Sequence, residues 1–226
     1  HEGSDTAAVQ HMPTGSDPQV QTPAHAMPEK KKLDVKSVTG TDIHAILPDL
    51  ARLRMAVFRD WPYLYDGTLD YEEKYLTKFA AAKGAAVICA YDGDDMVGAS
   101  TAAPMIEHAD EFGEPFKRAG YDLTKIFYCG ESVLLKSHRG YGLGHAFFDG
   151  REAQAHKLGG FTHSTFCRVV RPDDHPLKPA DYAPLDPFWN KRGYFPVDGI
   201  VATYDWKDIG QPGETPHKMQ FWMKKL

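Results

Sequence analysis

Apolar and polar residues alternate with helix or strand periodicity only beyond residue 32. The first 32 residues are rich in Gly, Pro, Ser, Thr, Gln and Ala and contain no Phe, Trp or Tyr. Such a segment buries too little apolar surface to offset the entropy lost on ordering. We therefore expect a flexible tail over residues 1–32 and one folded domain over residues 33–226. Met12 and Met27 are both candidate starts, so part of the tail could derive from cloning or processing.

The first half of the domain is predicted to contain a strand, two helices and two further strands. Apolar residues recur at three- and four-residue spacing in the first helix, at Leu50, Leu53 and Val57. The predicted elements are a strand at 33–38, a helix opened by Pro48, a helix from Asp70 with Glu73 as its capping-box partner, and strands at 85–91 and 96–102 joined by a tight turn.

The second half alternates strands with helices and places a glycine-rich turn before its longest helix. Asp186 and Pro187 have the residue types of an N-cap and a first-turn proline. The predicted elements are an irregular stretch at 104–125 with a short helix near 111–118, strands at 126–135 and 161–170, a helix from the glycine turn to about Leu158, a short helix after Asp186, and strands at 199–206 and 218–224.

Charge and composition argue against nucleic acid, a membrane or a metal as partners. The formal net charge is −5 and the pI is near 6.1, so no uniformly basic surface is expected. No apolar run reaches the ~18 residues that a membrane span needs. Cys89, Cys129 and Cys167 form no CxxC pair, and the histidines show no HExxH or zinc spacing. We expect a cytoplasmic protein with buried, reduced thiols.

The turn at 139–144, Arg-Gly-Tyr-Gly-Leu-Gly, carries the clearest chemical signal. Because it joins a strand to a helix, backbone N–H groups and the helix N-terminus would converge on an anion, and Gly142 and Gly144 leave room for a phosphate. The turn lacks the lysine of a Walker A loop, and Phe147 stands where a dinucleotide fingerprint needs glycine. A phosphate site is one interpretation, and a tight connection without a ligand is the other.

The segment Arg139-x-x-Gly142-x-Gly144, following the strand at 128–135, resembles the [Q/R]-x-x-G-x-[G/A] segment of the GNAT superfamily of N-acetyltransferases. Residues 188–194, Phe-Trp-Asn-Lys-Arg-Gly-Tyr, are similar to a later segment of that family. The resemblance implies an α/β fold with a mixed, mostly antiparallel central sheet, flanked by helices and splayed at an acyl-CoA site. It also implies transfer of an acetyl group from acetyl-CoA to an amine by direct attack in a ternary complex.

By this resemblance, acetyl-CoA is the cosubstrate and no metal is required. The pyrophosphate would be bound by the backbone of the glycine turn, with Arg139 adding charge, although Arg139 could also be an ordinary surface residue. The pantetheine would pair with the end of the preceding strand. The implied cofactor residues are Val133, Leu134, Leu135, Arg139, Gly140, Tyr141, Gly142, Leu143, Gly144 and His145.

Glu131 is the candidate general base. Strand alternation places it on one face with Cys129 and Val133, so we expect a partly desolvated carboxylate with a raised pKa. Gly130 could allow a local irregularity that exposes a backbone N–H near residue 133 or 134 to the oxyanion. The alternative is a structural glutamate that pairs with an arginine such as Arg168.

The proton source for the leaving thiolate is less defined. Many relatives have a tyrosine where this chain has Trp189, and an indole cannot supply that proton. Tyr194 is the candidate catalytic residue instead, with Tyr182 or solvent as alternatives. Trp189 itself is expected to be a packing residue.

The acceptor is expected to be a small-molecule amine. Trp61, Tyr63, Tyr65 and Arg171 are the candidate substrate-binding residues, since aromatic rings beside acidic residues suit an organic cation. These aromatics could equally pack on the core. Two other functions stay open: a non-catalytic acyl-CoA-binding module, and an acetyltransferase acting on protein lysines or N-termini. A homodimer is also left open.

Overall fold

The computed structural model describes residues 31–226. The predicted tail at 1–32 lies, except for its last two residues, outside the described residues. Within residues 31–226, no helix combines the length and the apolar character needed to cross a lipid bilayer. The same residues contain no group of three or more His, Cys, Asp or Glu side chains arranged to hold a metal ion.

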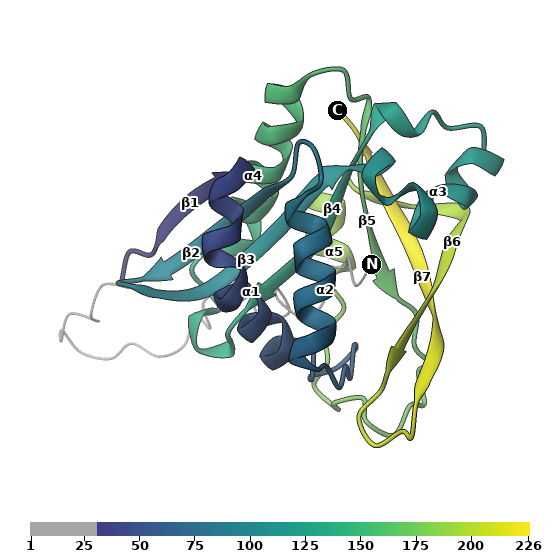
Figure 1. Cartoon of the computed structure of the whole chain (residues 1–226). Coiled ribbons are helices and arrows are strands. Elements are labelled where there is room, and N and C mark those ends of the chain that lie inside the picture. The colour runs from purple at the N-terminus through teal and green to yellow at the C-terminus, as the bar shows by residue number, and fades with distance from the viewer. Residues whose placement is uncertain (1–30) are drawn as a thin grey trace, which may run out of the picture.

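One seven-stranded sheet runs through the molecule in the order β1-β2-β3-β4-β5-β7-β6 (Figure 1). Neighbouring strands are antiparallel except β4 and β5, which are parallel. The strands are β1 (Asp34–Thr39), β2 (Ala86–Asp92), β3 (Asp95–Pro104), β4 (Ile126–Leu134), β5 (His163–Val169), β6 (Phe195–Lys207) and β7 (Glu214–Lys225). This confirms the predicted mixed, mostly antiparallel sheet.

Helices cover both faces of this sheet (Figure 1). They are α1 (Ile43–Val57), α2 (Leu69–Ala80), α3 (Ala109–Arg118), α4 (Leu143–Leu158) and α5 (Asp186–Lys191), with short 3₁₀ turns at Gly40–Asp42, Met105–His108, Leu123–Lys125 and Lys136–His138. The larger core lies under α1, α2 and α3, and a second core lies under α4 and α5. Buried strand residues therefore pack against one of two helical layers.

Three of the predicted helix starts are wrong by a few residues. Pro48 lies inside α1 instead of opening it. The N-cap of α2 is Thr68, whose hydroxyl accepts a hydrogen bond from the Tyr71 N–H at 3.2 Å, so the predicted capping box at Asp70 does not form. Asp186 is the first residue of α5 and not its N-cap. Capping depends on which backbone N–H a side chain can reach, which the residue types alone leave ambiguous.

A β-bulge interrupts the pairing of β3 with β4. Ser100 lies opposite Ser132 and Ala102 lies opposite Cys129, so two residues of β4 stand across from Thr101 alone. The extra residue shifts the alternation of side chains. Glu131 consequently faces α1, while Cys129 packs on the α4 side. The prediction that these two residues share one face is therefore wrong, although the predicted irregularity at Gly130 is confirmed.

β4 and β5 pair over only three residues each. Ile126–Tyr128 is in register with His163–Thr165, and beyond this point the strands separate. Within the described residues, no strand pairs with the β5-facing edge of β4 from Cys129 onward. The sheet is thus splayed where the resemblance predicted, and an extended ligand could complete the unpaired edge.

The three cysteines are buried and form no disulfide. Burial raises the pKa of the Cys89 thiol to about 12, so this thiol stays protonated at neutral pH. These observations confirm the predicted buried thiols.

The bulge generates a first prediction, because a Cβ atom at residue 130 would lie 2.5 Å from Thr101 Oγ1. Gly130→Ala should lower the free energy of unfolding by about 1–3 kcal/mol through overpacking, measured by urea denaturation. Gly213→Ala is the control, since its Cβ would meet nothing within 4 Å. Equal midpoints for the two variants would contradict close packing at the bulge.

Candidate functional site

The turn between β4 and α4 has the geometry of an anion cradle. Gly140 and Gly142 adopt left-handed conformations, with φ of 86° and 77°. Gly142 is the N-cap of α4, and a Cβ there would meet nothing within 4 Å, so the backbone faces open space. The first N–H groups of α4, at residues 143–145, have no partner one turn earlier in the helix. These groups and the helix dipole can together hold a phosphate.

The unpaired edge of β4 precedes this cradle in the chain, with only the 3₁₀ turn at Lys136–His138 between them. The Leu135 N–H donates to the Val97 carbonyl at 3.0 Å, so the main-chain groups of Leu135 point toward β3. Because these groups alternate sides along a strand, those of Leu134 point into the splay. Val133, which lies opposite Ala99, also points its main chain toward β3. Of the three predicted pantetheine-binding residues, Leu134 is therefore the one oriented toward a ligand in the splay.

Arg139 is the first residue of the glycine turn. Burial lowers its pKa, and the charge of Asp60 opposes this effect. Arg139 lines a cavity of about 390 Å³ that we call the turn cavity. Its lining residues are Arg59, Asp60, Trp61, Leu64, Lys136, Arg139, Leu177, Pro179, Asp181, Tyr182 and Ile209. The structure thus brings Arg139 and Trp61, which were predicted to bind different substrates, to one cavity.

Glu131 is buried and bound on every side by polar groups. Arg54 of α1 and the hydroxyls of Tyr75 and Thr101 donate hydrogen bonds to its carboxylate. Thr101 Oγ1 also accepts the Glu131 N–H at 2.9 Å. Burial alone would raise the pKa of Glu131, but the charge of Arg54 and the two hydroxyls outweigh it and hold the pKa below its ordinary value. The predicted raised pKa is wrong, and the arginine partner is Arg54, not Arg168.

Arg54 joins this carboxylate to a second one. Its Nε donates to Glu72 Oε2 at 2.6 Å, and Tyr65 Oη donates to Glu72 Oε1 at 2.8 Å. The guanidinium lies over the Tyr75 ring, 4.3 Å from the centroid. Sequence reasoning missed Arg54, yet a signal existed: it lies four residues after Leu50, in the apolar stripe that faces the core.

Tyr194 lies on the opposite side of the sheet from Glu131. It is fully buried against Phe148 and Phe166, and its hydroxyl is 2.8 Å from Ser164 Oγ. Burial raises its pKa well above the ordinary value, so the phenol is protonated at neutral pH. The two predicted catalytic residues are thus separated by the sheet, because the bulge directs Glu131 toward α1.

Trp189 packs as expected. Its ring centroid lies 4.8 Å from that of Phe166 and 5.0 Å from that of Trp222. Its side chain is fully buried. These contacts support the prediction that Trp189 fills the core under α5.

Two predicted acceptor-binding residues belong to the core instead. Tyr63 is 1% exposed, with its ring 4.6 Å from that of Phe58, and Tyr65 is 4% exposed. Both residues follow the cis peptide bond between Trp61 and Pro62 and turn inward under α1. Their side chains therefore pack in the core and line neither of the cavities that contain Trp61.

Arg171 ties the segment after β5 to the α1–α2 connection. Its Nε donates to the Pro62 carbonyl at 2.8 Å and its Nη2 to the Tyr63 carbonyl at 2.7 Å. Its Nη1 and Nη2 also bind the Asp208 carboxylate at 2.8 and 2.9 Å. With these donors engaged, Arg171 positions the loop, and its predicted contact with a substrate would have to break this network.

A second cavity, of about 250 Å³, shares Trp61 and Tyr182 with the turn cavity. We call it the loop cavity, because the segment after β5 forms most of its wall. The rings of Trp61 and Tyr182 meet edge to face with centroids 6.2 Å apart. The lining residues are Trp61, Pro62, Arg168, Val169, Val170, Arg171, Pro172, Asp173, Lys178, Tyr182, Pro184 and Asp186.

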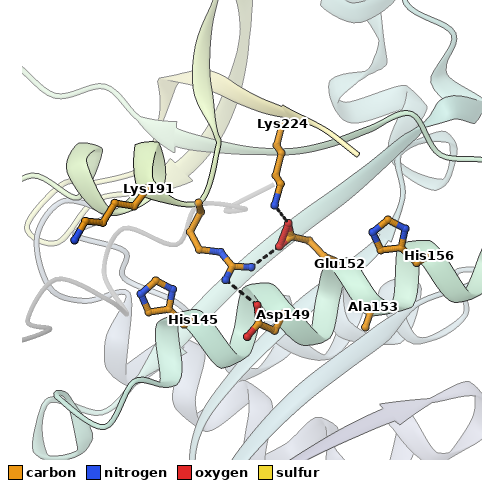
Figure 2. Close-up of a pocket in the computed structure, with 8 residues that line it drawn as sticks. His145, Asp149, Glu152, Ala153, His156, Lys191 and Lys224 are labelled. Carbon is orange, nitrogen blue, oxygen red and sulfur yellow. Dashed lines mark hydrogen bonds and ion pairs between the residues drawn. The ribbon is translucent and has the colours of Figure 1, made fainter.

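A groove of about 550 Å³ runs along the outer side of α4, beginning at His145 of the cradle (Figure 2). Its two carboxylates are already engaged: Arg192 binds Asp149 and Glu152, and Lys224 also binds Glu152. In Figure 2, Lys191 and His145 lie at one end of the groove and His156 lies at the other, and no interaction joins them to either carboxylate. The groove can therefore accept an anionic group beside the cradle.

Comparisons with known proteins show similarity at the level of the fold. No family model and no curated protein matches the chain. An acetyltransferase structure from Thermus thermophilus has a TM-score of 0.53 at 16% identity, covering 87% of this chain and 98% of that one. A GNAT-family acetyltransferase from Streptococcus pneumoniae has a TM-score of 0.52 at 12% identity, covering 86% and 100%. A ribosomal-protein-alanine N-acetyltransferase from Brucella melitensis has a TM-score of 0.54 at 13% identity, covering 85% and 99%.

The buried ion pair generates a prediction with a definite pH dependence. Arg54→Met leaves the Glu131 carboxylate buried without its cation and should cost about 3–5 kcal/mol of stability. With the lowered pKa of the native protein, the contribution of Glu131 is complete above the ordinary value of 4.5 and is lost as the pH falls below it. In the variant, burial would instead raise this pKa, so the deficit should shrink as the pH decreases.

Urea denaturation of Arg54→Met and of the native protein at about pH 8 and about pH 5 measures this decrease of the stability deficit. Arg52→Met is the matched control, because Arg52 lies on the same helix with a side chain 54% exposed. Its stability should change by about 0.5 kcal/mol or less. A deficit in Arg54→Met that grows on acidification would contradict the assigned pairing.

Proposed function

We propose that this chain, which has the fold of the GNAT acetyltransferases, is an acetyl-CoA-dependent N-acetyltransferase. One observation carries the proposal: the open edge of β4 is followed, after the 3₁₀ turn at Lys136–His138, by the glycine cradle at the N-terminus of α4. An extended ligand with amide groups suits such an edge, and a pyrophosphate suits such a cradle. Coenzyme A contains both parts in this order.

In this proposal the N–H groups at residues 143–145 hold the pyrophosphate, and Leu134 pairs with the pantetheine. The thioester then lies in the splay between β4 and β5, close to the bulge. A Leu134 N–H that points into the splay can donate to the oxyanion that forms on the thioester carbonyl. The nucleotide end would lie over the groove along α4, where Lys191 and His145 suit its additional phosphate.

The reaction proceeds by direct attack. The amine nitrogen attacks the thioester carbonyl carbon and forms a C–N bond, and the C–S bond then breaks. The departing thiolate of coenzyme A takes up the second proton that the nitrogen releases, so the products are the amide and the coenzyme A thiol. The ammonium must lose a proton before attack, and we propose that Glu131 accepts it through Tyr75 of α2, whose hydroxyl donates to the carboxylate and whose side chain is only partly buried. The lowered pKa makes Glu131 a weak base that is ionised throughout the neutral range.

Calorimetric titration with acetyl-CoA tests the cradle. Gly142→Trp should weaken binding by tenfold or more, since a side chain there occupies the space in front of the α4 N–H groups. Gly120→Trp is the matched control, because Gly120 also has positive φ, at 86°, and an open environment, but lies after α3. Similar affinities of the two variants for acetyl-CoA would contradict the assignment of the cradle as the cofactor site. If the native protein does not bind acetyl-CoA, the proposed function is wrong.

A thiol-release assay with a panel of amines distinguishes an enzyme from a non-catalytic acyl-CoA-binding module. If Glu131 takes the proton, Glu131→Gln should reduce kcat by about 10²–10⁴-fold and move the pH profile. Glu72→Gln is the control, since it disturbs the same arginine without touching β4, and its kcat should fall far less. Equal decreases of kcat in the two variants would indicate that Glu131 is only a structural partner of Arg54.

A further inference from the structure

The loop cavity lies beside the splay and shares Trp61 and Tyr182 with the turn cavity. Trp61 and Pro62 of the α1–α2 connection form one wall, and Arg168–Val170, at the end of β5, forms another. This part of β5 has already separated from β4, so the cavity opens next to the strand edge assigned to the acyl donor. A molecule bound there would lie close to the proposed thioester position.

The cavity is built from fixed parts. Arg171 links its loop wall to the backbone of the α1–α2 connection and to Asp208, which also contacts His217 Nε2 at 3.0 Å. The ring of Trp61 is also held by His175, whose ring centroid lies 5.0 Å away. Preorganised walls reduce the ordering needed when a ligand binds.

The formal charges of the lining are already paired. Arg168 Nη1 binds Asp186 at 2.9 Å, and Lys178 Nζ lies 3.7 Å from Asp173. Arg171 is paired with Asp208. An excess of negative charge, which an organic cation would require, is therefore absent among the described residues of this lining.

Two buried N–H donors remain without acceptors among the described residues. They are Trp61 Nε1 and Arg168 Nε, and both residues line the loop cavity. Trp61 is only 7% exposed. A buried donor without an acceptor costs about 1–3 kcal/mol, so both nitrogens favour a ligand that brings oxygen atoms.

The geometry of the Arg168 guanidinium indicates which oxygen-bearing group the ligand carries. Arg168 hydrogen-bonds described residues only through Nη1, which leaves the edge formed by Nε and Nη2 for a ligand. Two parallel N–H groups on this edge match the two oxygens of a carboxylate.

We propose that the loop cavity binds the carboxylate of the acceptor, so that the acceptor is an amino acid or another small amine that carries a carboxylate. This inference rests on the proposed function and names its substrate class. Arg168 and Trp61 are the binding residues, and the free amine of the same molecule points toward the splay. A volume of about 250 Å³ equals roughly eight water molecules, which suits a small molecule.

The test compares L-amino acids with their carboxamides in the thiol-release assay. Native protein should show a KM at least tenfold lower for each accepted amino acid than for its carboxamide. Arg168→Gln should abolish this preference while leaving acetyl-CoA affinity unchanged. Arg118→Gln is the control, because Arg118 is an exposed arginine at the end of α3 with a side chain 72% exposed.

Trp61→Phe keeps an aromatic ring but removes the indole N–H, so it should raise KM for the amino acids severalfold and stands in if Arg168→Gln does not fold. Equal KM values for acids and carboxamides would overturn the inference while leaving acetyl transfer intact. A loss of acetyl-CoA affinity in Arg168→Gln would also overturn it, because the cavity would then belong to the cofactor.

Calorimetry gives a second readout that does not depend on turnover. N-acetyl amino acids should bind the complex of native protein with coenzyme A more tightly than their carboxamides do, and this difference should vanish in Arg168→Gln. If the protein binds coenzyme A but neither product form, the inference fails. Absence of thiol release with every amine would count against the proposed enzyme and not against the carboxylate site.

Discussion

The buried guanidinium of Arg54 is the contact on which the arrangement of the site depends. It connects α1 to Glu72 of α2 and to Glu131 of β4, and the hydroxyl of Thr101 on β3 completes the same carboxylate. Breaking a buried pair of this kind is costly because it leaves a charge without a partner. The two helices and the two central strands are therefore held in one relative position, and the bulge lies at their meeting point.

The bulge and the splay together create the proposed donor site. The extra residue in β4 directs Glu131 toward α1 and α2, and the separation of β5 leaves the other edge of β4 unpaired. A regular sheet would bury this edge in hydrogen bonds with β5, and no ligand could then reach it. Beyond the open edge, the 3₁₀ turn at Lys136–His138 and the glycine turn lead to α4, whose first N–H groups have no partner one turn earlier in the helix. Trp61 then separates the cavity beside this turn from the loop cavity.

The sequence predicted the elements better than it predicted the neighbours of single residues. The strand before the glycine turn, the helix after it and the cradle itself could be read from local patterns, because strand alternation, glycine conformation and helix N-termini are local properties. The face on which Glu131 lies could not be read from local patterns, because one extra residue in a strand reverses the alternation. Its pKa could not be read either, because its partner, Arg54, lies 77 residues away in the chain. Tyr63 and Tyr65 were misplaced for a related reason, since aromatic residues in a connection can face either solvent or core.

Local patterns in the chain were sufficient to establish the order of strands and helices, the glycine turn at the start of α4, and the burial of the three cysteines. Each of these follows from residues that are close together in the chain. Tertiary packing established that β4 and β5 separate, that Arg54 neutralises Glu131, that Arg171 is occupied by Asp208, and that Arg168 and Trp61 share one cavity. These features depend on contacts between distant segments, whose geometry is set by the packing of two helical layers on one twisted sheet.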